Sequence, residues 1–193
     1  MNETSKSIAR RLRDVSFVRY FAGCGLDVGC GPDPLGRYAP LFPGMGAVRG
    51  WDRADGDAQD LPGVAAGAFD WLHSSHCLEH LRDPHAALRR WCEVVRPGGH
   101  VVVLVPDEDL YEQGVWPSRF NADHKHTFTL SKRRSWSPAS VNVFELLARV
   151  NDLAEPLRAE KLDGTFLLFP ELVDQTLGPV AESAIEFVLR RLP

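Results

Sequence analysis

The sequence predicts a doubly wound α/β fold, in which helices cover both faces of a mostly parallel β-sheet. Three observations predict this fold. A short apolar strand at 26–28 runs directly into the glycine-rich turn Gly29–Gly31. Segments of helical spacing alternate with apolar runs of strand length, which is typical of parallel strands joined by helices. The run His100–Val105 is continuous and rich in β-branched residues, as in a strand that is buried on both faces.

The first half of the chain is expected to begin with a helix over residues 5–20, whose apolar residues recur at helical spacing. After the strand at 26–28, prolines bracket residues 35–41 and leave room for only a turn or two of helix. Residues 45–51 should form the second strand. The polar run 52–57 follows at once, so the helix that usually connects the second and third strands is predicted to be reduced or missing.

The next elements are a largely buried strand over residues 68–75 and a helix that begins at Asp83 and Pro84. Asp83 can cap this helix, and proline is favoured at the first helical position. The Pro-Gly-Gly run at 97–99 should stop the helix before the valine-rich strand. Residues 107–136 form a polar and aromatic connection, and a connection of this length in a compact domain is usually functional or mobile.

The C-terminal part is expected to continue with a helix from Ser137 onward. A strand pair over 157–162 and 165–169 would turn at the Asp-Gly sequence between them. Helical spacing after Gly178 predicts a final amphipathic helix. The strand pair would add an antiparallel terminal strand to the sheet.

Composition and charge exclude several classes of function. The chain has 193 residues, enough for one domain with a substantial core, and a net charge of −4 with a pI near 6.0. No global basic field draws it to nucleic acid or to anionic lipid, so we expect neither a nucleic-acid partner nor a membrane partner. No apolar stretch approaches the roughly 18 residues of a membrane span, and no signal-peptide core is seen, so a cytoplasmic protein is expected.

The four cysteines form no Cys-x-x-Cys pair, so neither a disulfide framework nor a zinc knuckle is indicated. Free thiols in a reducing compartment are expected. These residues are Cys24, Cys30, Cys77 and Cys92.

The glycine turn and a later acidic residue together indicate a ligand. Glycines after a buried strand allow a ligand to approach the main chain closely. When an acidic residue ends the next strand about 20 residues later, the pattern fits a nucleoside cofactor whose ribose hydroxyls donate to the acid. Asp52 stands at that separation from Gly31. The sequence therefore predicts a nucleoside-binding crevice at this edge of the sheet.

Five segments in a fixed order carry a resemblance to a known family. They are Leu26–Gly31, the strand ending at Asp52, Gly56–Ala58, Phe69–His80 and Arg96–Gly99. Together they resemble the class I S-adenosylmethionine-dependent methyltransferases, in particular the small branch often called type 11. The resemblance implies a Rossmann-like sheet of seven strands with the last one antiparallel, and S-adenosyl-L-methionine as the cofactor.

The resemblance also implies roles for residues at the glycine turn. Asp27 would hold the methionine amino group of the cofactor, directly or through water. The backbone of Gly29, Cys30 and Gly31 would lie against the cofactor.

For the nucleoside, the resemblance implies that Asp52, with Arg53 beside it, accepts hydrogen bonds from the ribose hydroxyls. Asp57 and Ala58 would meet the adenine. Because the segment after Asp52 is crowded, Asp55 could instead take the role given to Asp52 or to Asp57.

Ser75 and His76 would line the crevice beside the methyl group. The sulfonium already activates that methyl group, so the enzyme mainly has to place a lone pair in line with it. A hydroxyl or a protonated amine as acceptor also needs a base, and histidine suits this role near neutral pH. His76 is one candidate, and His124 or His126 on the long connection are others; each could instead be a structural histidine.

Two histidine patterns raise the question of a metal. Residues 76–80, His-Cys-Leu-Glu-His, match the zinc pattern of inverted zincin proteases, but that motif needs both histidines on one helical face, and His76 directly follows a buried strand. The group Asp123, His124 and His126 lacks an identifiable further ligand, and metal sites need three or four. No metal is therefore predicted.

The sequence predicts S-adenosyl-L-methionine-dependent methyl transfer to a small-molecule or glycan acceptor, with O-methylation favoured. One alternative is a non-catalytic methyltransferase-like domain that supports a partner, suggested by the reduced segment after the second strand. Another is a nicotinamide oxidoreductase, whose fingerprint needs a small residue where this chain has Pro34. We expect a single domain over 1–193, made of an N-terminal helix (1–20), a cofactor half (21–107), a substrate-side insertion (108–136), and C-terminal helices with a strand pair (137–193).

Overall fold

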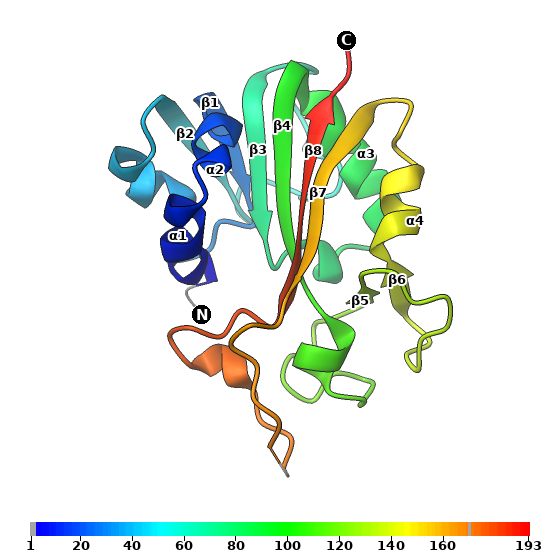
Figure 1. Cartoon of the computed structure of the whole chain (residues 1–193). Coiled ribbons are helices and arrows are strands. Elements are labelled where there is room, and N and C mark those ends of the chain that lie inside the picture. Colours follow the sequence, from blue (N-terminus) through cyan, green and yellow to red (C-terminus); the bar gives the residue numbers. More distant parts are fainter. Residues whose placement is uncertain (1–2, 170) are drawn as a thin grey trace.

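The computed structural model describes residues 3–169 and 171–193 (Figure 1). Its centre is a six-stranded sheet with the strand order β2-β1-β3-β4-β8-β7, and two short strands form a separate sheet. The strands are β1 (Gly23–Val28), β2 (Met45–Trp51), β3 (Phe69–Ser75), β4 (Val95–Pro106), β5 (Thr127–Thr129), β6 (Ser140–Asn142), β7 (Ala154–Leu162) and β8 (Ala184–Arg191).

The direction of the strands confirms the predicted fold class. β2, β1, β3 and β4 run parallel, and β8 is antiparallel to both of its neighbours, β4 and β7. The large sheet has six strands rather than the seven that the family resemblance implies. Residues 52–68, all of them described, contain neither a strand nor a helix between β2 and β3. The predicted loss of the helix after the second strand is therefore confirmed.

Helices cover both faces of the sheet (Figure 1). None of the described helices has the length and apolar character needed to cross a bilayer. Figure 1 shows α1 and α2 on one side of the sheet and α3 and α4 on the other. The α-helices are α1 (Glu3–Arg13), α2 (Ser16–Tyr20), α3 (Pro84–Val94) and α4 (Val143–Ala148). The 3₁₀ helices are η1 (Leu35–Leu41), η2 (Leu78–His80) and η4 (Gln175–Leu177), and η3 (Glu108–Glu112) is a π-helix.

The prediction of a single helix over residues 5–20 is wrong, because this segment forms two helices, α1 and α2, with a break at residues 14–15. The carboxylate of Asp14 accepts hydrogen bonds from the backbone N–H of Ser16, at 3.0 Å, and from its hydroxyl, at 2.6 Å. Such a local bond between side chain and backbone competes with the helical hydrogen bonds. The helical period itself continues across the break, which is why it did not reveal the interruption.

β4 separates two hydrophobic cores. Val101 and Val103 pack in the core under α3, which contains Trp91, while Val102 packs in the core under α2, which contains Phe17. Successive side chains of a strand point to opposite faces, so a strand with apolar residues at every position is covered on both sides. The prediction that this strand is buried on both faces is confirmed.

The predictions for the C-terminal part are wrong in two places. The helix expected after Gly178 is instead β8, which lies between β4 and β7 and is buried along residues 184–189. A continuously apolar run fits either a buried helix or a strand buried on both faces, so its spacing alone does not separate the two. The described residues 165–169 form no strand, because β7 pairs with β8 and not with the segment that follows it.

The helix expected from Ser137 starts later in the chain. Residues 140–142 first form β6, and α4 begins only at Val143. The side chain of Asn142 accepts a hydrogen bond from the backbone N–H of Glu145 at 3.2 Å, so asparagine caps the helix here.

Candidate active site

The carboxyl ends of the parallel strands meet along one edge of the sheet, where open α/β sheets bind their ligands. Two adjoining cavities lie there: an outer cavity of about 700 Å³ and an inner cavity of about 200 Å³. Gly29, Gly31, His76 and His80 line both, so the cavities are continuous at the glycine turn. Of the other residues predicted for the site, Asp52, Arg53, Asp57 and Ala58 line the outer cavity, and Cys30, Ser75 and His124 line the inner cavity.

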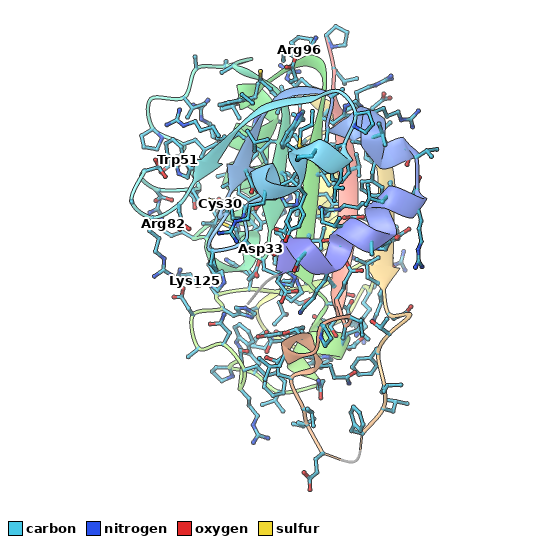
Figure 2. The ribbon with its side chains drawn as sticks, turned by 90° about the vertical axis from the view of Figure 1, so that its left-hand side faces the viewer. Cys30, Asp33, Trp51, Arg82, Arg96 and Lys125 are labelled. Carbon is cyan, nitrogen blue, oxygen red and sulfur yellow. The ribbon has the colours of Figure 1, made fainter. Side chains whose placement is uncertain are left out.

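The long connection after β4 closes one side of this crevice. In Figure 2, Cys30 of the glycine turn and Asp33, which follows the turn, lie between Trp51, at the end of β2, and Lys125 of the connection. The backbone N–H of Lys125 donates to the carbonyl of Glu79 at 2.9 Å. Because Lys125 also lines the outer cavity, the connection forms part of the crevice wall.

The glycine turn is fixed by its neighbours at the ends of β2 and β3. The N–H of Gly29 donates to the carbonyl of Trp51 at 2.8 Å. Gly29 has φ +70°, and a Cβ at this position would lie 2.6 Å from the Cβ of Cys77. The backbone conformation and the lack of space both require glycine here, which keeps the main chain exposed to the crevice.

Asp52 lies directly after β2 and is bound to the glycine turn. Its Oδ2 accepts a hydrogen bond from the N–H of Gly31 at 3.0 Å, and its Oδ1 accepts one from the N–H of Arg53 at 2.7 Å. Asp55 accepts from the N–H of Asp52 at 2.9 Å and is not among the residues that line either cavity. Of the two acids that the sequence left open, the structure therefore brings Asp52 to the crevice.

Asp57 and Ala58 form the far wall of the outer cavity, and each is held by a residue outside the crevice. Arg82 forms an ion pair with Asp57 at 2.8 Å. The indole N–H of Trp91 donates to the carbonyl of Ala58 at 2.8 Å. Arg53 forms an exposed ion pair with Asp123 at 2.9 Å, which joins the two sides of the outer cavity.

Asp27 lies beneath the crevice and lines neither cavity. Both of its oxygens are engaged: Oδ1 lies 2.6 Å from His73 Nδ1, and Oδ2 accepts from the N–H of Leu35 at 2.7 Å. Arg11 Nη1 lies 3.1 Å from the other ring nitrogen of His73. Since a guanidinium only donates, His73 Nε2 must accept, and Nδ1–H donates to Asp27. Burial lowers the pKa of His73, in agreement with this neutral tautomer.

Ser75 and His76, at the end of β3, reach the inner cavity with free polar atoms. Neither the hydroxyl of Ser75 nor His76 Nε2 has a hydrogen-bond partner among the described residues. His76 has φ +52°, a conformation that side chains other than glycine rarely adopt and that is enriched at functional sites. Burial, with nearby His124, Lys6 and His80, lowers the pKa of His76 to about 3, so the imidazole is neutral.

Glu79 is a site residue that the sequence did not single out. Its side chain is fully buried in the wall of the inner cavity, and neither carboxylate oxygen has a hydrogen-bond partner among the described residues. Burial raises its pKa to about 7, despite the opposing effect of nearby His124. Glu79 belongs to the segment Phe69–His80, one of the five that carry the family resemblance. Its place in that segment was the feature of the sequence that could have indicated a functional role.

His124 and His126, the two candidates on the long connection, have different environments. His124 is buried at the inner cavity, and its Nδ1 lies 2.7 Å from Glu112 Oε1. Because the carboxylate accepts, the Nδ1–H of His124 donates, and in the neutral ring the lone pair is on Nε2. His126 Nε2 lies 3.1 Å from the carbonyl of Leu81 and lines neither cavity, so it holds the connection in place.

Comparison with known proteins identifies relatives of this chain. The sequence model of a family described as a methyltransferase domain matches residues 5–137. An uncharacterized 37.1 kDa protein in transposon TN4556 of Streptomyces fradiae is 32% identical over 105 residues, which are 44% of this chain and 30% of that protein. The ubiquinone biosynthesis O-methyltransferase of Pectobacterium carotovorum is 30% identical over 97 residues, which are 50% of this chain and 36% of that protein.

A solved structure has a similar fold. The S-adenosylmethionine-dependent methyltransferase from Mesorhizobium loti matches with a TM-score of 0.55 and 18% identity, over 93% of this chain and 100% of that chain. The chain spans only about a third of the length of the two curated relatives. The family match covers more than half of the chain, and it includes the glycine turn, the long connection, the lining of the outer cavity and the lining of the inner cavity except Glu3 and Thr4.

Proposed function

Because the chain belongs to the family of methyltransferase domains, we propose that it transfers the methyl group of S-adenosyl-L-methionine to an oxygen atom of a small-molecule or glycan acceptor. One observation carries this proposal. A crevice lined by the glycine turn and Asp52 continues, at His76, into a smaller cavity lined by histidines and by a carboxylate without a hydrogen-bond partner among the described residues. The first part suits a nucleoside cofactor, and the second suits a polar acceptor.

The outer cavity is the proposed place of the adenosyl group. Asp52 would accept hydrogen bonds from the ribose hydroxyls, with Arg53 at the rim, and Asp57 and Ala58 would meet the adenine. A carboxylate that accepts from a vicinal diol fixes the sugar and hence the direction of the attached sulfonium. Asp27 is proposed as a positioning residue, because its oxygens already accept from His73 and from the backbone next to the glycine turn.

The methyl group would then lie at the junction of the two cavities, beside Gly29, Cys30 and Gly31. His76 lies where the two cavities join, and Ser75 lies in the inner cavity next to that junction. Placing the acceptor in line with the carbon–sulfur bond can itself lower the barrier by roughly 7–11 kcal/mol. Positioning is therefore the main task of this part of the chain.

His76 is proposed as the general base. Its neutral imidazole lines both cavities, and its Nε2, 3.7 Å from Glu3 Oε2, has no hydrogen-bond partner among the described residues. The acceptor's O–H proton would pass to His76 as the oxygen forms its bond to the methyl carbon. The carbon–sulfur bond breaks with its electron pair on sulfur, and S-adenosylhomocysteine leaves. His124, oriented by Glu112, would line the acceptor site beside His76.

Oxygen is preferred as the acceptor atom for two reasons. A base with a lowered pKa is a weak one, and it is matched best to an acceptor whose proton is acidic, such as a phenol. One of the curated relatives is named as an O-methyltransferase of ubiquinone biosynthesis. The similarity to this relative covers only half of this chain and 36% of that protein. The choice of oxygen as the acceptor atom is therefore part of the proposal.

The proposal is tested by binding and by turnover, measured separately. Calorimetry should show binding of S-adenosyl-L-methionine and S-adenosylhomocysteine but not of NAD. Release of S-adenosylhomocysteine with a panel of phenols and sugars should then show methyl transfer. Binding of NAD alone would favour the oxidoreductase. Cofactor binding with no turnover on any acceptor class would favour the non-catalytic domain.

The base is tested with His76→Asn, since asparagine tolerates the positive φ of this position. Loss of a general base should lower the turnover rate by about 10²–10⁴-fold. The affinity for S-adenosylhomocysteine should change much less. His85→Asn is the matched control, because His85 lies on α3 and lines neither cavity. Equal turnover of the two variants would exclude His76 as the base.

A further inference from the structure

Glu79 lies at the centre of a group of imidazoles in the wall of the inner cavity. Its Oε1 is 3.6 Å from His76 Nδ1, 3.8 Å from His80 Nε2 and 4.0 Å from His124 Nε2. Within the described chain, both carboxylate oxygens lack a hydrogen-bond partner although the side chain is fully buried. Burying a carboxylate without compensation is costly, so a cation among these groups would stabilise the ionised form of Glu79.

The hydrogen bonds of two of these histidines fix which ring nitrogen is free. His80 Nδ1 lies 3.1 Å from the carbonyl oxygen of Asp123, and His124 Nδ1 lies 2.7 Å from Glu112 Oε1. Both oxygens only accept, so both Nδ1 atoms carry the proton. In the neutral form of each ring the lone pair is then on Nε2, and the Nε2 atoms of His80 and His124 both face Glu79. Histidines that bind metals are held in this way, with the second ring nitrogen donating to a carboxylate or a carbonyl.

From this geometry we propose that Glu79, His80 and His124 bind one divalent transition-metal ion, with Zn²⁺ as its simplest representative. Their three ligand atoms lie within 4.8 Å of one another. In a tetrahedral zinc site, ligand atoms are about 3.3 Å apart, so the pairs at 3.8 and 4.0 Å need to close by about 0.5–0.7 Å.

The donor set selects the class of ion. Two imidazole nitrogens and one carboxylate suit Zn²⁺, Fe²⁺ or Co²⁺, whereas Mg²⁺ and Ca²⁺ prefer oxygen ligands throughout. Three protein ligands leave at least one position open, which is the arrangement of catalytic rather than structural zinc sites. Because all three residues line the inner cavity, a molecule in this cavity could take the open position.

This site differs from the metal patterns considered in the sequence. Residues 76–80 form a turn and a 3₁₀ helix, so the helical face that the protease motif needs is missing here. His80 and Glu79 instead supply the further ligands that the group around His124 lacked. His126, the other histidine of that group, contacts the carbonyl of Leu81 and takes no part.

The ion would define how the acceptor binds, a consequence that rests on the proposed function. An acceptor hydroxyl on the open position would have its proton acidified, as a metal lowers the pKa of bound water. That proton would pass to His76, which lies outside the triad. The oxygen would then take the methyl group as the carbon–sulfur bond breaks, and His76 would return the proton to solvent. The substrate class is thus a small molecule whose hydroxyl can bind a metal, such as a catechol or another chelating phenol.

The test is a titration of the EDTA-treated chain with ZnCl₂, followed by calorimetry, with the visible absorption of Co²⁺ as a second readout. The wild type should bind one Zn²⁺ per chain. Glu79→Gln and His124→Ala should each weaken binding at least tenfold, and His85→Ala, on α3, should leave it unchanged. Glu112→Gln changes only the orientation of His124 and should weaken binding by about 10–100-fold.

Absence of saturable Zn²⁺ binding to the folded wild type, or undiminished binding in Glu79→Gln and His124→Ala, would overturn the proposal. If those variants do not fold, as judged by circular dichroism, His80→Ala, at a partly exposed position, and Glu112→Gln are measured in their place, and undiminished Zn²⁺ binding in both would overturn the proposal. Binding of S-adenosylhomocysteine to the metal-free chain is measured in parallel. Its failure would overturn the proposed function and leave the metal site standing, and turnover that survives EDTA would overturn only the role of the ion in catalysis.

Discussion

His73 donates to Asp27 across 2.6 Å, in the layer of side chains directly beneath the glycine turn. The opposite ring nitrogen of His73 accepts from Arg11, and Arg11 donates in turn to Glu186 of β8 at 2.7 Å. Arg10 donates to the other oxygen of Glu186 at 2.6 Å. This buried chain of polar groups connects α1, β1, β3 and β8, so the position of the crevice floor depends on the N-terminal helix.

Asp27→Asn should lower the free energy of unfolding by about 1–3 kcal/mol, measured by chemical denaturation. Asparagine has a single acceptor oxygen, whereas Asp27 accepts from both His73 and the N–H of Leu35. One buried donor therefore loses its partner. Asp60→Asn, in an exposed ion pair with Arg82, is the control and should change stability by less than about 0.5 kcal/mol. A stable Asp27→Asn variant with greatly weakened cofactor binding would instead indicate direct contact with the cofactor.

The buried chain of polar groups should also make stability depend on pH. Burial lowers the pKa of His73 below its ordinary 6.5. For Glu186, burial alone would raise the pKa, but Arg11 and Arg10 hold it below its ordinary 4.5. In both cases the unfolded chain binds more protons than the folded one, so stability is full above the unfolded-state pKa and is lost as the pH falls.

The loss from His73 should begin as the pH falls through its unfolded-state value of 6.5, and that from Glu186 only below 4.5. His73→Gln removes one titrating group. Between about pH 7 and pH 5, the free energy of unfolding of the variant should therefore fall less steeply with pH than that of the wild type, and the two slopes should differ by at most about 1.4 kcal/mol per pH unit. Denaturation curves at a series of pH values provide the measurement. Identical slopes for the variant and the wild type would contradict the neutral state assigned to His73.

Gly29→Ala should destabilise the chain more than Gly63→Ala does. Both glycines have positive φ, +70° and +76°, so both variants carry the backbone cost of roughly 1–2 kcal/mol. Only at Gly29 would the new Cβ collide with Cys77, whereas no atom of the described residues lies within 4 Å of the Cβ position at Gly63. Overpacking adds about 1–3 kcal/mol. Thermal and chemical denaturation of the two variants isolate this steric part, and equal losses would show that the turn can shift away from Cys77.

Elements fixed by local chemistry could be predicted from the sequence. Asp83 caps α3 as expected, because its side chain accepts from the backbone N–H of His85 and Ala86. The glycine turn and the strand end at Asp52 were predictable for the same reason, since turn residues and strand ends have local signatures. β8 could not be predicted in this way. This segment is a strand because it pairs with β4 and β7 on its two sides, and these pairings join residues that are far apart in the sequence.

The inner cavity shows the same limit. His76 could be predicted from its place at the end of a strand, but Glu79 acquires its meaning only when His124 arrives from the long connection. Glu112, which orients His124, belongs to no sequence motif considered above, so its role could not be predicted either. Contacts of this kind depend on how a loop folds back over the sheet, and loops of this length have no periodic signal.

Asp52→Ala should weaken the binding of S-adenosyl-L-methionine by about 10–100-fold, since hydrogen bonds to a charged group contribute roughly 1.5–3 kcal/mol. Asp55→Ala should weaken it far less, because Asp55 accepts only from the backbone N–H of Asp52 and lines neither cavity. Calorimetry on both variants provides the comparison, and their melting temperatures without ligand show whether the turn at Gly31 has loosened. Equal losses of affinity in the two variants would mean that the carboxylate of Asp52 does not hold the ribose.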